Sequence, residues 1–325
     1  MPEGKGVASS AALEVAALSA VAAAWGCHLA PEQLAAACQW AENHVVGAPC
    51  GIMDQMTSAC GRRNRLLRLR CQPAIIEGYL EVPTGYRFYG IDSGIRHDVS
   101  AADYRTVRTA AFMGYRMIAE AAGLRVEREG SRVTITDPWW GGYLANLPAA
   151  EFAGRFAALL PSEIDGAEFL TRFGGITDTV TQVEPGHRYP VRQATAHPIH
   201  EQQRVERFAR LLGELPARRG AAEELGELMY ASHQSYGACG LGSAGTDRLV
   251  DLVAGVGPEG GLFGAKITGG GSGGTVAILG ASDAEPLVRD LAARYQKETG
   301  RRAEVFSESG PGSAESGVLL LQASP

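Results

Sequence analysis

The sequence predicts an α+β protein in which helices and strands are partly segregated. Two observations carry this prediction. Apolar residues recur at helical spacing over several long stretches, and β-branched residues gather in short runs beside glycine-rich turns. The two kinds of segment alternate irregularly, so a repeating strand–helix–strand unit is not expected. With 325 residues, the chain is long enough for one large domain or two ordinary ones.

The first predicted helix follows a glycine-rich start. Ser9 or Ser10 is expected to cap it, and it runs to Trp25 before Gly26 ends it. A second helix opens at Pro31, because the fixed φ angle of proline suits a first turn. The expected buried stripe of this second helix consists of Leu34, Cys38, Ala41 and Val45.

A short third helix is predicted over residues 52–60 and a strand over residues 86–92. Ser100 and Asp103 have the spacing of a capping box and are expected to open a long helix. Further predicted helices cover about residues 148–160, 200–212, 221–236, 246–253 and 284–299, and further predicted strands cover 262–268, 275–279 and 303–307. The first two of those strands flank a glycine loop and are expected to pair as a hairpin or as adjacent strands.

The composition is that of an ordinary globular protein, with 45% apolar and 20% charged residues. The formal net charge of −6 argues against a surface for nucleic acids or anionic membranes. The alanine-rich stretch at residues 7–25 contains Glu14 and follows no basic segment, so we interpret it as a buried helix and not as a signal peptide or membrane span. The six cysteines include no C-x-x-C pair, which favours reduced thiols and a cytoplasmic protein.

The first candidate site is the glycine-rich segment ahead of the first helix. It is neither a Walker A loop nor a dinucleotide fingerprint. Gly4 and Gly6 let backbone N–H groups converge on an anion, and the following helix N-terminus attracts phosphate. Ser9 and Ser10 offer hydroxyl groups to a phosphate or to Mg²⁺. The alternative is a plain structural turn, and this segment alone does not decide between the two.

Two acids lie where the second helix ends and the third begins, Glu42 and Asp54. Asp54 is expected to stay ionised because the helix dipole stabilises its charge. An ionised acid suits the acceptance of a hydroxyl proton in phosphoryl transfer. For each acid the alternative is a helix cap or a solvated charge. Ile52, Met53 and Met56 flank Asp54 and favour a partly buried site for it.

A second glycine loop covers residues 269–274, where five of the six residues are glycine. Ordering so many glycines is costly unless the backbone must approach something closely, which favours a functional loop over a flexible turn. The sequence has no metal-ligand cluster, nucleophile elbow or Ser-His-Asp spacing. Some single polar residues are expected to be surface groups or satisfied hydrogen-bonding partners, namely Lys5, Tyr104, His233, Ser235 and Asp247.

Taken in order, three segments resemble the GHMP small-molecule kinase superfamily. Residues 2–12 resemble its phosphate loop, and residues 264–274 resemble its third motif. Residues 42–55, ending in Cys50-Gly51-Ile52-Met53-Asp54-Gln55, resemble its sugar-kinase branch, of the L-arabinokinase and galactokinase type. The resemblance implies a GHMP kinase fold, with an N-terminal α/β domain like ribosomal protein S5, truncated here, and a C-terminal ferredoxin-like α+β domain. It implies the remainder of the ATP-binding domain at residues 1–125, an irregular connecting region at 126–195 and the C-terminal kinase domain at 196–325.

The resemblance also implies an activity, that of an ATP-dependent sugar 1-kinase that uses Mg²⁺. Its substrate would be the anomeric hydroxyl of L-arabinose or of a galactose-like sugar, with no nucleic-acid or membrane partner; the oligomeric state stays open. Asp54 would be catalytic, Ser10 and Glu42 would hold the metal, and Tyr104 would contact the sugar. ATP would be bound by Gly4, Lys5, Gly6, Val7, Ala8, Ser9, Ser10 and Ala11, and the third-motif loop would consist of Gly269, Gly270, Gly271, Gly273 and Gly274.

The sequence departs from the family pattern in three places. Ala8 stands where the family commonly has serine, and Thr275 stands where it commonly has cysteine. Neither change is expected to abolish phosphate binding, because the neighbouring amides and Ser9 and Ser10 are present. The family's first motif would precede residue 1, so we interpret the sequence as a fragment or late-started gene product. An apolar face of the first helix is then expected to be exposed.

Two other functions stay open at this point. The chain could be a non-catalytic sugar or nucleotide sensor, or a fragment of the kinase without activity. The presence of Asp54, Glu42 and Ser10 speaks against the sensor, since a sensor needs no base.

Overall fold

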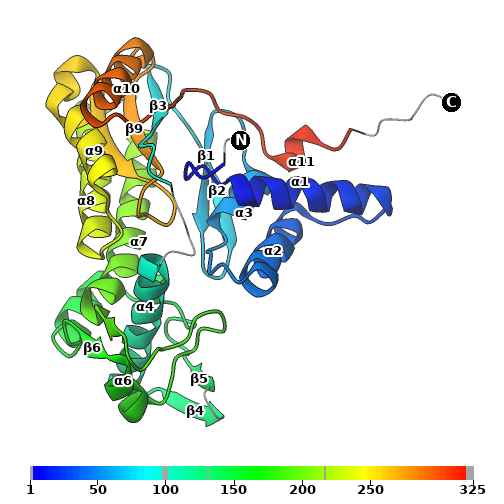
Figure 1. The fold of residues 1–325 in the computed structure, drawn as a ribbon, viewed down its shortest axis with the longest axis vertical. Helices are drawn as coiled ribbons and strands as arrows, with labels where there is room; N and C mark the ends of the chain where they lie inside the picture. The colour runs from blue at the N-terminus through cyan, green and yellow to red at the C-terminus, as the bar shows by residue number, and fades with distance from the viewer. Residues whose placement is uncertain (1–2, 97–101, 130–131, 216, 320–325) are drawn as a thin grey trace.

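The structure is a computed structural model that describes residues 3–96, 102–129, 132–215 and 217–319. Its elements form three groups (Figure 1). One contains the first three helices and a two-stranded sheet, the second is built on a four-stranded sheet, and the third contains α4, α6 and short strands. Helix α7 joins the last two groups, because it packs against both α4 and α8. The predicted α+β class is confirmed.

A small apolar core holds the first group together. Helices α1 (Ser9–Ala24), α2 (Pro31–Ala41) and α3 (Met53–Cys60) pack on one another, and β1 (Arg65–Arg70) pairs antiparallel with β2 (Ile75–Glu81). The sequence predicted the three helices but not the two strands. The buried core consists of Val15, Leu34, Ala35, Cys38, Ile52, Met56, Ala59 and Cys60.

Two local predictions for this group are wrong. The N-cap of α1 is Ala8, in the left-handed conformation with φ of 59°, and Ser9 and Ser10 lie in the first turn of the helix instead of capping it. Val45 is exposed instead of buried, because a π turn over Glu42–Val46 shifts the helical period after α2.

The predicted exposure of an apolar face on α1 is confirmed. Leu13 and Trp25 keep 72% and 75% of their surface accessible, and Val21 is also exposed. Helix α1 therefore buries little more than the side that faces α2 and α3.

The second group is built on an antiparallel sheet with the strand order β10-β3-β9-β8. Strand β3 (Tyr86–Asp92) pairs along its whole length with β9 (Thr275–Ala281), which also pairs with β8 (Leu262–Ile267). Strand β10 (Val305–Phe306) lies on the other side of β3. The strand at residues 86–92 and the pairing of the two strands around the glycine loop are confirmed.

Three helices pack against this sheet, α8 (Ala221–Ala238), α9 (Ala244–Val256) and α10 (Glu285–Thr299). All three begin and end within about three residues of the predicted bounds, within the usual uncertainty of helix ends. Strand β3 comes from the range expected for the N-terminal domain, yet its hydrogen bonds go to β9 and β10. The division into residues 1–125, 126–195 and 196–325 stays a prediction.

The third group surrounds an aromatic core that includes Trp140, Phe152, Phe156, Phe169 and Phe173. Its main helices are α4 (Ala102–Ala121), α6 (Gly166–Phe173) and α7 (Val191–Glu214), so α7 begins earlier than expected. The strand pairs β4 (Arg125–Glu129) with β5 (Arg132–Thr136) and β6 (Ile164–Asp165) with β7 (Arg188–Tyr189) were not predicted.

The helix expected over residues 148–160 is much shorter in the structure. It consists of α5 (Ala149–Glu151) and a π turn over Phe152–Phe156. Ser100, predicted to cap α4 together with Asp103, lies outside the described residues. The remaining short elements are 3₁₀ turns at Leu144–Asn146 and Pro258–Gly260 and helix α11 (Ser313–Ser316).

No helix among the described residues combines the length and the apolar character needed to cross a membrane. The six cysteines are free thiols, as predicted.

Candidate active site

The glycine-rich start of the chain forms an irregular loop that leads directly into α1. Gly4, Gly6 and Ala8 have φ angles of 72°, 66° and 59°, so left-handed residues alternate along the loop. Backbone N–H groups in such an alternation turn toward one side and can hold an anion. Among the residues that the structure describes, no side chain caps the N-terminus of α1. The first amides of the helix are therefore left for water or for a ligand such as phosphate.

The second glycine loop lies directly behind the first. A Cβ atom added to Gly6 would lie 3.0 Å from the Cα atom of Gly274, so the two backbones touch. The Thr275 hydroxyl donates a hydrogen bond to the Lys5 carbonyl at 2.7 Å. The loop over residues 269–274 thus supports the phosphate loop, and Thr275, a departure from the family pattern, makes one of the contacts.

Two cations accompany the phosphate loop. The Lys5 ammonium does not extend into open space but binds the carboxylates of Asp92 and Glu304. The Arg96 side chain packs against Gly4, where an added Cβ would lie 3.6 Å from the Arg96 Cγ. Sequence reasoning assigned Lys5 to ATP and did not single out Arg96. The Arg96 charge beside the loop lowers the cost of holding a polyanion there, whereas the Lys5 charge is compensated by its two carboxylates.

Asp54 lies in the first turn of α3, and its neighbour Gln55 ties that turn to α1. The Gln55 amide donates hydrogen bonds to Glu14 on α1, at 3.3 Å, and to Glu42. Asp54 is partly buried, as predicted. The start of α3 therefore lies beside the second turn of α1, one turn beyond Ser10.

Two tyrosines lie within electrostatic reach of Asp54. Burial raises the pKa of Tyr104 on α4, the nearby Arg108 opposes that shift, and the charge of Asp54 adds to it. Burial likewise raises the pKa of Tyr236 on α8, with a contribution from Asp54. Both phenols are therefore neutral at physiological pH and can donate hydrogen bonds. Tyr236 donates to the Gly269 carbonyl at 3.0 Å, which links the surroundings of Asp54 to the second glycine loop.

Behind Tyr236 lies a buried polar network that the sequence did not predict as a unit. The Lys266 ammonium lies 5.3 Å from the centre of the Tyr236 ring, and Ser232 donates a hydrogen bond to Glu201. Burial lowers the pKa of His197 to about 4, so this imidazole, which is bonded to Ser235, stays neutral at physiological pH. Lys266 and His197 both contact the ring of Tyr236 and so restrict its position.

Arg108 connects several parts of the site. Its guanidinium forms two hydrogen bonds with Asp178, at 2.8 and 2.9 Å, and donates to the Cys50 carbonyl at 3.3 Å. Its positive charge also acts on the nearby Tyr104 phenol, where it opposes the rise in pKa that burial causes. Arg108 and Asp178 keep 18% and 4% of their side-chain surface exposed. The pair therefore anchors the loop that precedes Asp54.

Replacing Arg108 by methionine is expected to destabilise the protein by about 3 kcal/mol, because it leaves the buried Asp178 carboxylate without its cation. Chemical denaturation measures this. The control is Arg125→Met, whose exposed pair with Glu127 should contribute less than about 1 kcal/mol. Equal losses in the two variants would show that the buried pair has no special role.

The residues predicted to hold a metal are partly brought together. Glu42 is buried, and Glu14 shares the Gln55 amide with it. Burial raises the pKa of Glu14, and the charge of Glu42 adds to the shift. Ser10 lies one turn before Glu14 on α1 and is exposed. No group of three or more His, Cys, Asp or Glu residues suited to a metal occurs in the described part of the chain.

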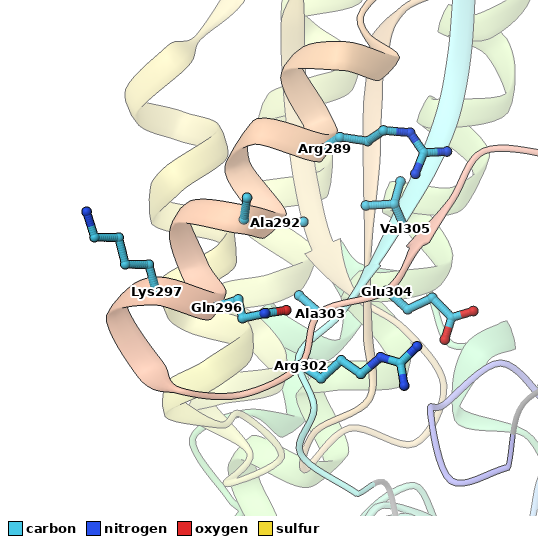
Figure 2. A pocket seen from close by; sticks show the side chains of 9 residues that line it. Arg289, Ala292, Gln296, Lys297, Arg302, Ala303, Glu304 and Val305 are labelled. Carbon is cyan, nitrogen blue, oxygen red and sulfur yellow. The ribbon is translucent and has the colours of Figure 1, made fainter.

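The cavities described in the structure do not mark this site. One of about 640 Å³ lies between α10 and β10 and is lined by polar residues that include Arg289, Gln296, Lys297, Arg302 and Glu304 (Figure 2). Another of about 330 Å³ lies beside Tyr86 and Phe263. Neither includes Asp54 or the phosphate loop. We therefore describe the site by the loops and helix ends that meet there.

Some of the missed residues carried a signal in the sequence. Glu14 is the only charged residue in an alanine-rich helix, and Arg108 lies four residues after Tyr104, on the same face of α4. Asp178 and Glu304 had no such signal, because their partners lie 70 and 299 residues away.

Comparisons with known proteins agree with this arrangement. The profile of the GHMP kinases N terminal domain matches residues 1–62, and that of the GHMP kinases C terminal domain matches residues 206–297. The L-arabinokinase of Arabidopsis thaliana is 43% identical over 344 residues, which cover 99% of this chain and 33% of that protein. A galactokinase of Chloroflexus aggregans is 29% identical over 304 residues, covering 93% of this chain and 64% of that protein.

The fold also has a counterpart among solved structures. The crystal structure of Lactococcus lactis galactokinase complexed with galactose superposes with a TM-score of 0.71 at 19% identity, covering 96% of this chain and 68% of that one. The chain thus spans one third of the L-arabinokinase and about two thirds of the galactokinases. With both domain profiles matched in order and nearly its whole length aligned to sugar kinases, the chain carries the N-terminal and C-terminal domains of the GHMP kinases.

Proposed function

We propose that this chain is the catalytic part of an ATP-dependent sugar 1-kinase that phosphorylates the anomeric hydroxyl of L-arabinose or of a galactose-like sugar. The observation that carries the proposal is that the two glycine loops touch at the start of α1, while Gln55, the neighbour of Asp54, is hydrogen-bonded to Glu14 on the second turn of the same helix. The similarity to L-arabinokinase and to galactokinases supports the substrate class. A cytoplasmic location stays a prediction from the sequence.

The chemistry follows from the roles that these residues can fill. The amides of residues 4–11 would bind the phosphate tail at the N-terminus of α1. Asp54 accepts or orients the proton of the sugar hydroxyl, so that its oxygen bonds to the γ-phosphorus while the bond to the β-phosphate oxygen breaks. Tyr104, which is neutral, would donate a hydrogen bond to the sugar or orient Asp54, whereas Tyr236 donates its proton to the Gly269 carbonyl. Because Arg108 donates a hydrogen bond to the Cys50 carbonyl, it holds the loop before Asp54 in place, which pre-orients that acid.

The residues around Glu42 fit a divalent cation. Glu14 and Glu42 share one amide donor, and the Oε1 atom of the buried Gln55 has no hydrogen-bond partner among the described residues. Two acids with one shared donor leave negative charge uncompensated, and carboxylates with a hydroxyl are the ligands that Mg²⁺ prefers. Glu42 and Ser10 would hold the ion. When bound, Mg²⁺ neutralises charge on the transferring phosphates.

Glu42→Gln is expected to weaken metal binding in the presence of nucleotide by about tenfold, which corresponds to about 1.4 kcal/mol. The shape of the side chain and an acceptor for Gln55 are kept, so the fold should be unchanged. Electron paramagnetic resonance of bound Mn²⁺ measures the affinity without turnover. Glu32→Gln, an exposed acid at the start of α2, is the control. An unchanged Mn²⁺ affinity in Glu42→Gln would remove Glu42 from the metal site.

The activity itself is tested with a panel of sugars and ATP, coupled to ADP release. The assay is run on the 325-residue protein and on any longer product of the same gene. We expect L-arabinose or a galactose-like sugar to give the highest kcat/KM. Ligand-induced thermal shifts without sugar phosphate in either protein would instead identify a sensor. If neither protein shows a thermal shift with ligand or forms a sugar phosphate, the proposed function is overturned.

A further inference from the structure

Three strands of the four-stranded sheet, β3, β9 and β10, begin or end close together, next to the phosphate loop. Asp92 ends β3 and pairs in register with Thr275, the first residue of β9. Glu304 immediately precedes β10, and its carbonyl accepts a hydrogen bond from the Asp92 amide at 2.9 Å. The side chains of Glu304, Asp92 and Thr275 are therefore presented side by side by neighbouring strands.

All three side chains contact Lys5. The Lys5 ammonium lies 3.2 Å from the Asp92 carboxylate and also binds the Glu304 carboxylate. The Thr275 hydroxyl donates to the Lys5 carbonyl at 2.7 Å. In Figure 2 the Glu304 side chain extends away from α10, on the side where the blue N-terminal loop runs. The sheet edge thus holds Lys5 both by its side chain and by its backbone.

The burial of these side chains and the directions of their pKa shifts indicate that the Lys5 ammonium is paired with both carboxylates. Its side chain keeps 21% of its surface exposed, and that of Asp92 keeps 4%. Hydrogen bonding to Glu304 raises the pKa of Lys5, and the Lys5 ammonium lowers the pKa of Glu304. Moving the ammonium onto a phosphate would leave the buried Asp92 carboxylate without its cation, which is costly. Two carboxylates already neutralise this one positive charge.

We propose that Lys5 is a positioning residue, which fixes the phosphate loop to the strand ends of the four-stranded sheet and does not bind phosphate itself. Lys5, Asp92, Thr275 and Glu304 form a latch that sets the loop before nucleotide arrives, so that less ordering is needed on binding. The proposal rests on the proposed function only in assigning phosphate to this loop.

The decisive comparison is between Lys5→Met and Glu304→Gln. If the latch holds the loop, both variants weaken MgATP binding by about tenfold, because each lowers the fraction of loops in the competent position to about a tenth. The double variant then loses little more than either single one. If Lys5 instead binds phosphate, removing the Glu304 charge frees the ammonium and tightens MgATP binding. Isothermal titration calorimetry measures the affinities, and Glu308→Gln is the control for loss of an exposed acid on the same segment.

Thr275 provides a second, matched pair of variants. Thr275→Val keeps the shape and the strand preference but removes the hydroxyl, whereas Thr275→Ser keeps the hydroxyl. We expect Thr275→Val to weaken MgATP binding by about fivefold and Thr275→Ser by less than about twofold, since only the valine variant leaves the Lys5 carbonyl without its donor. Equal affinities in the two variants would remove Thr275 from the latch.

Hydrogen–deuterium exchange separates this proposal from the proposed function. Without any ligand, the amides of residues 3–8 should exchange about tenfold faster in Lys5→Met than in the wild type. Helices α8, α9 and α10 should keep their protection. A protein that binds no ATP would overturn the kinase assignment but leave this measurement valid. Unchanged exchange in Lys5→Met would overturn the latch even in an active kinase.

Discussion

Asp54→Asn is expected to reduce sugar phosphorylation by about 10³-fold while leaving MgATP affinity within about twofold. The amide keeps the shape of the carboxylate and its place in the first turn of α3, but it cannot accept the hydroxyl proton. The binding amides of the phosphate loop belong to residues 4–11 and are untouched. Steady-state rates of ADP release and calorimetric titration with a non-hydrolysable ATP analogue measure the two quantities.

The control for Asp54→Asn is Asp290→Asn, which removes the same charge from the exposed face of α10. Wild-type turnover in Asp54→Asn would refute the catalytic role. A parallel loss of ATP affinity and turnover would indicate damage to the phosphate loop instead, because Gln55, the next residue, ties α3 to α1 through Glu14.

Gly6→Ala is expected to produce the second largest effect, a loss of at least about tenfold in MgATP affinity. A side chain at φ of 66° is strained by about 1–2 kcal/mol, and here its Cβ would also press on the Cα atom of Gly274 at 3.0 Å. The two glycine loops can then relax only by moving apart, which displaces the amides that hold phosphate. Calorimetry gives the affinity, and thermal denaturation gives the cost to the fold.

Gly123 is the matched control for this substitution. It has a φ angle of 75°, and a Cβ added there would have no heavy atom within 4 Å. Gly123→Ala should therefore show the backbone strain alone, with unchanged MgATP affinity. If Gly6→Ala binds MgATP as well as Gly123→Ala does, the close contact between the loops is not needed for phosphate binding.

Predictions from the sequence succeeded where a signal lies within a few residues of its effect. Proline at the start of α2 and β-branched runs around the second glycine loop gave elements close to those observed. The predictions were wrong where the backbone conformation of a neighbouring loop overrode a local preference. Ser9 and Ser10 are good capping residues, but Ala8 takes the N-cap position because the loop alternates left-handed residues up to it.

The site shows the same division. The three motifs identified Asp54, Glu42 and both glycine loops, because each motif is a continuous segment. They could not assign Lys5, which looks like a phosphate ligand in its segment but binds Asp92 and Glu304 in the fold. Nor could they find Asp178, which lies in an irregular stretch and acts only through Arg108.

The sequence by itself indicated the GHMP kinase domains, the two glycine loops and the candidate acid Asp54. Only the tertiary structure decided what holds those parts in place: β3 pairs with β9 across some 180 residues of chain, and that pairing sets Asp92 next to Thr275 under Lys5. The physical reason is how far apart in the sequence the interacting residues lie. Helix caps and turns depend on neighbours within about four residues, whereas an ion pair between distant residues depends on the packing of every element between them.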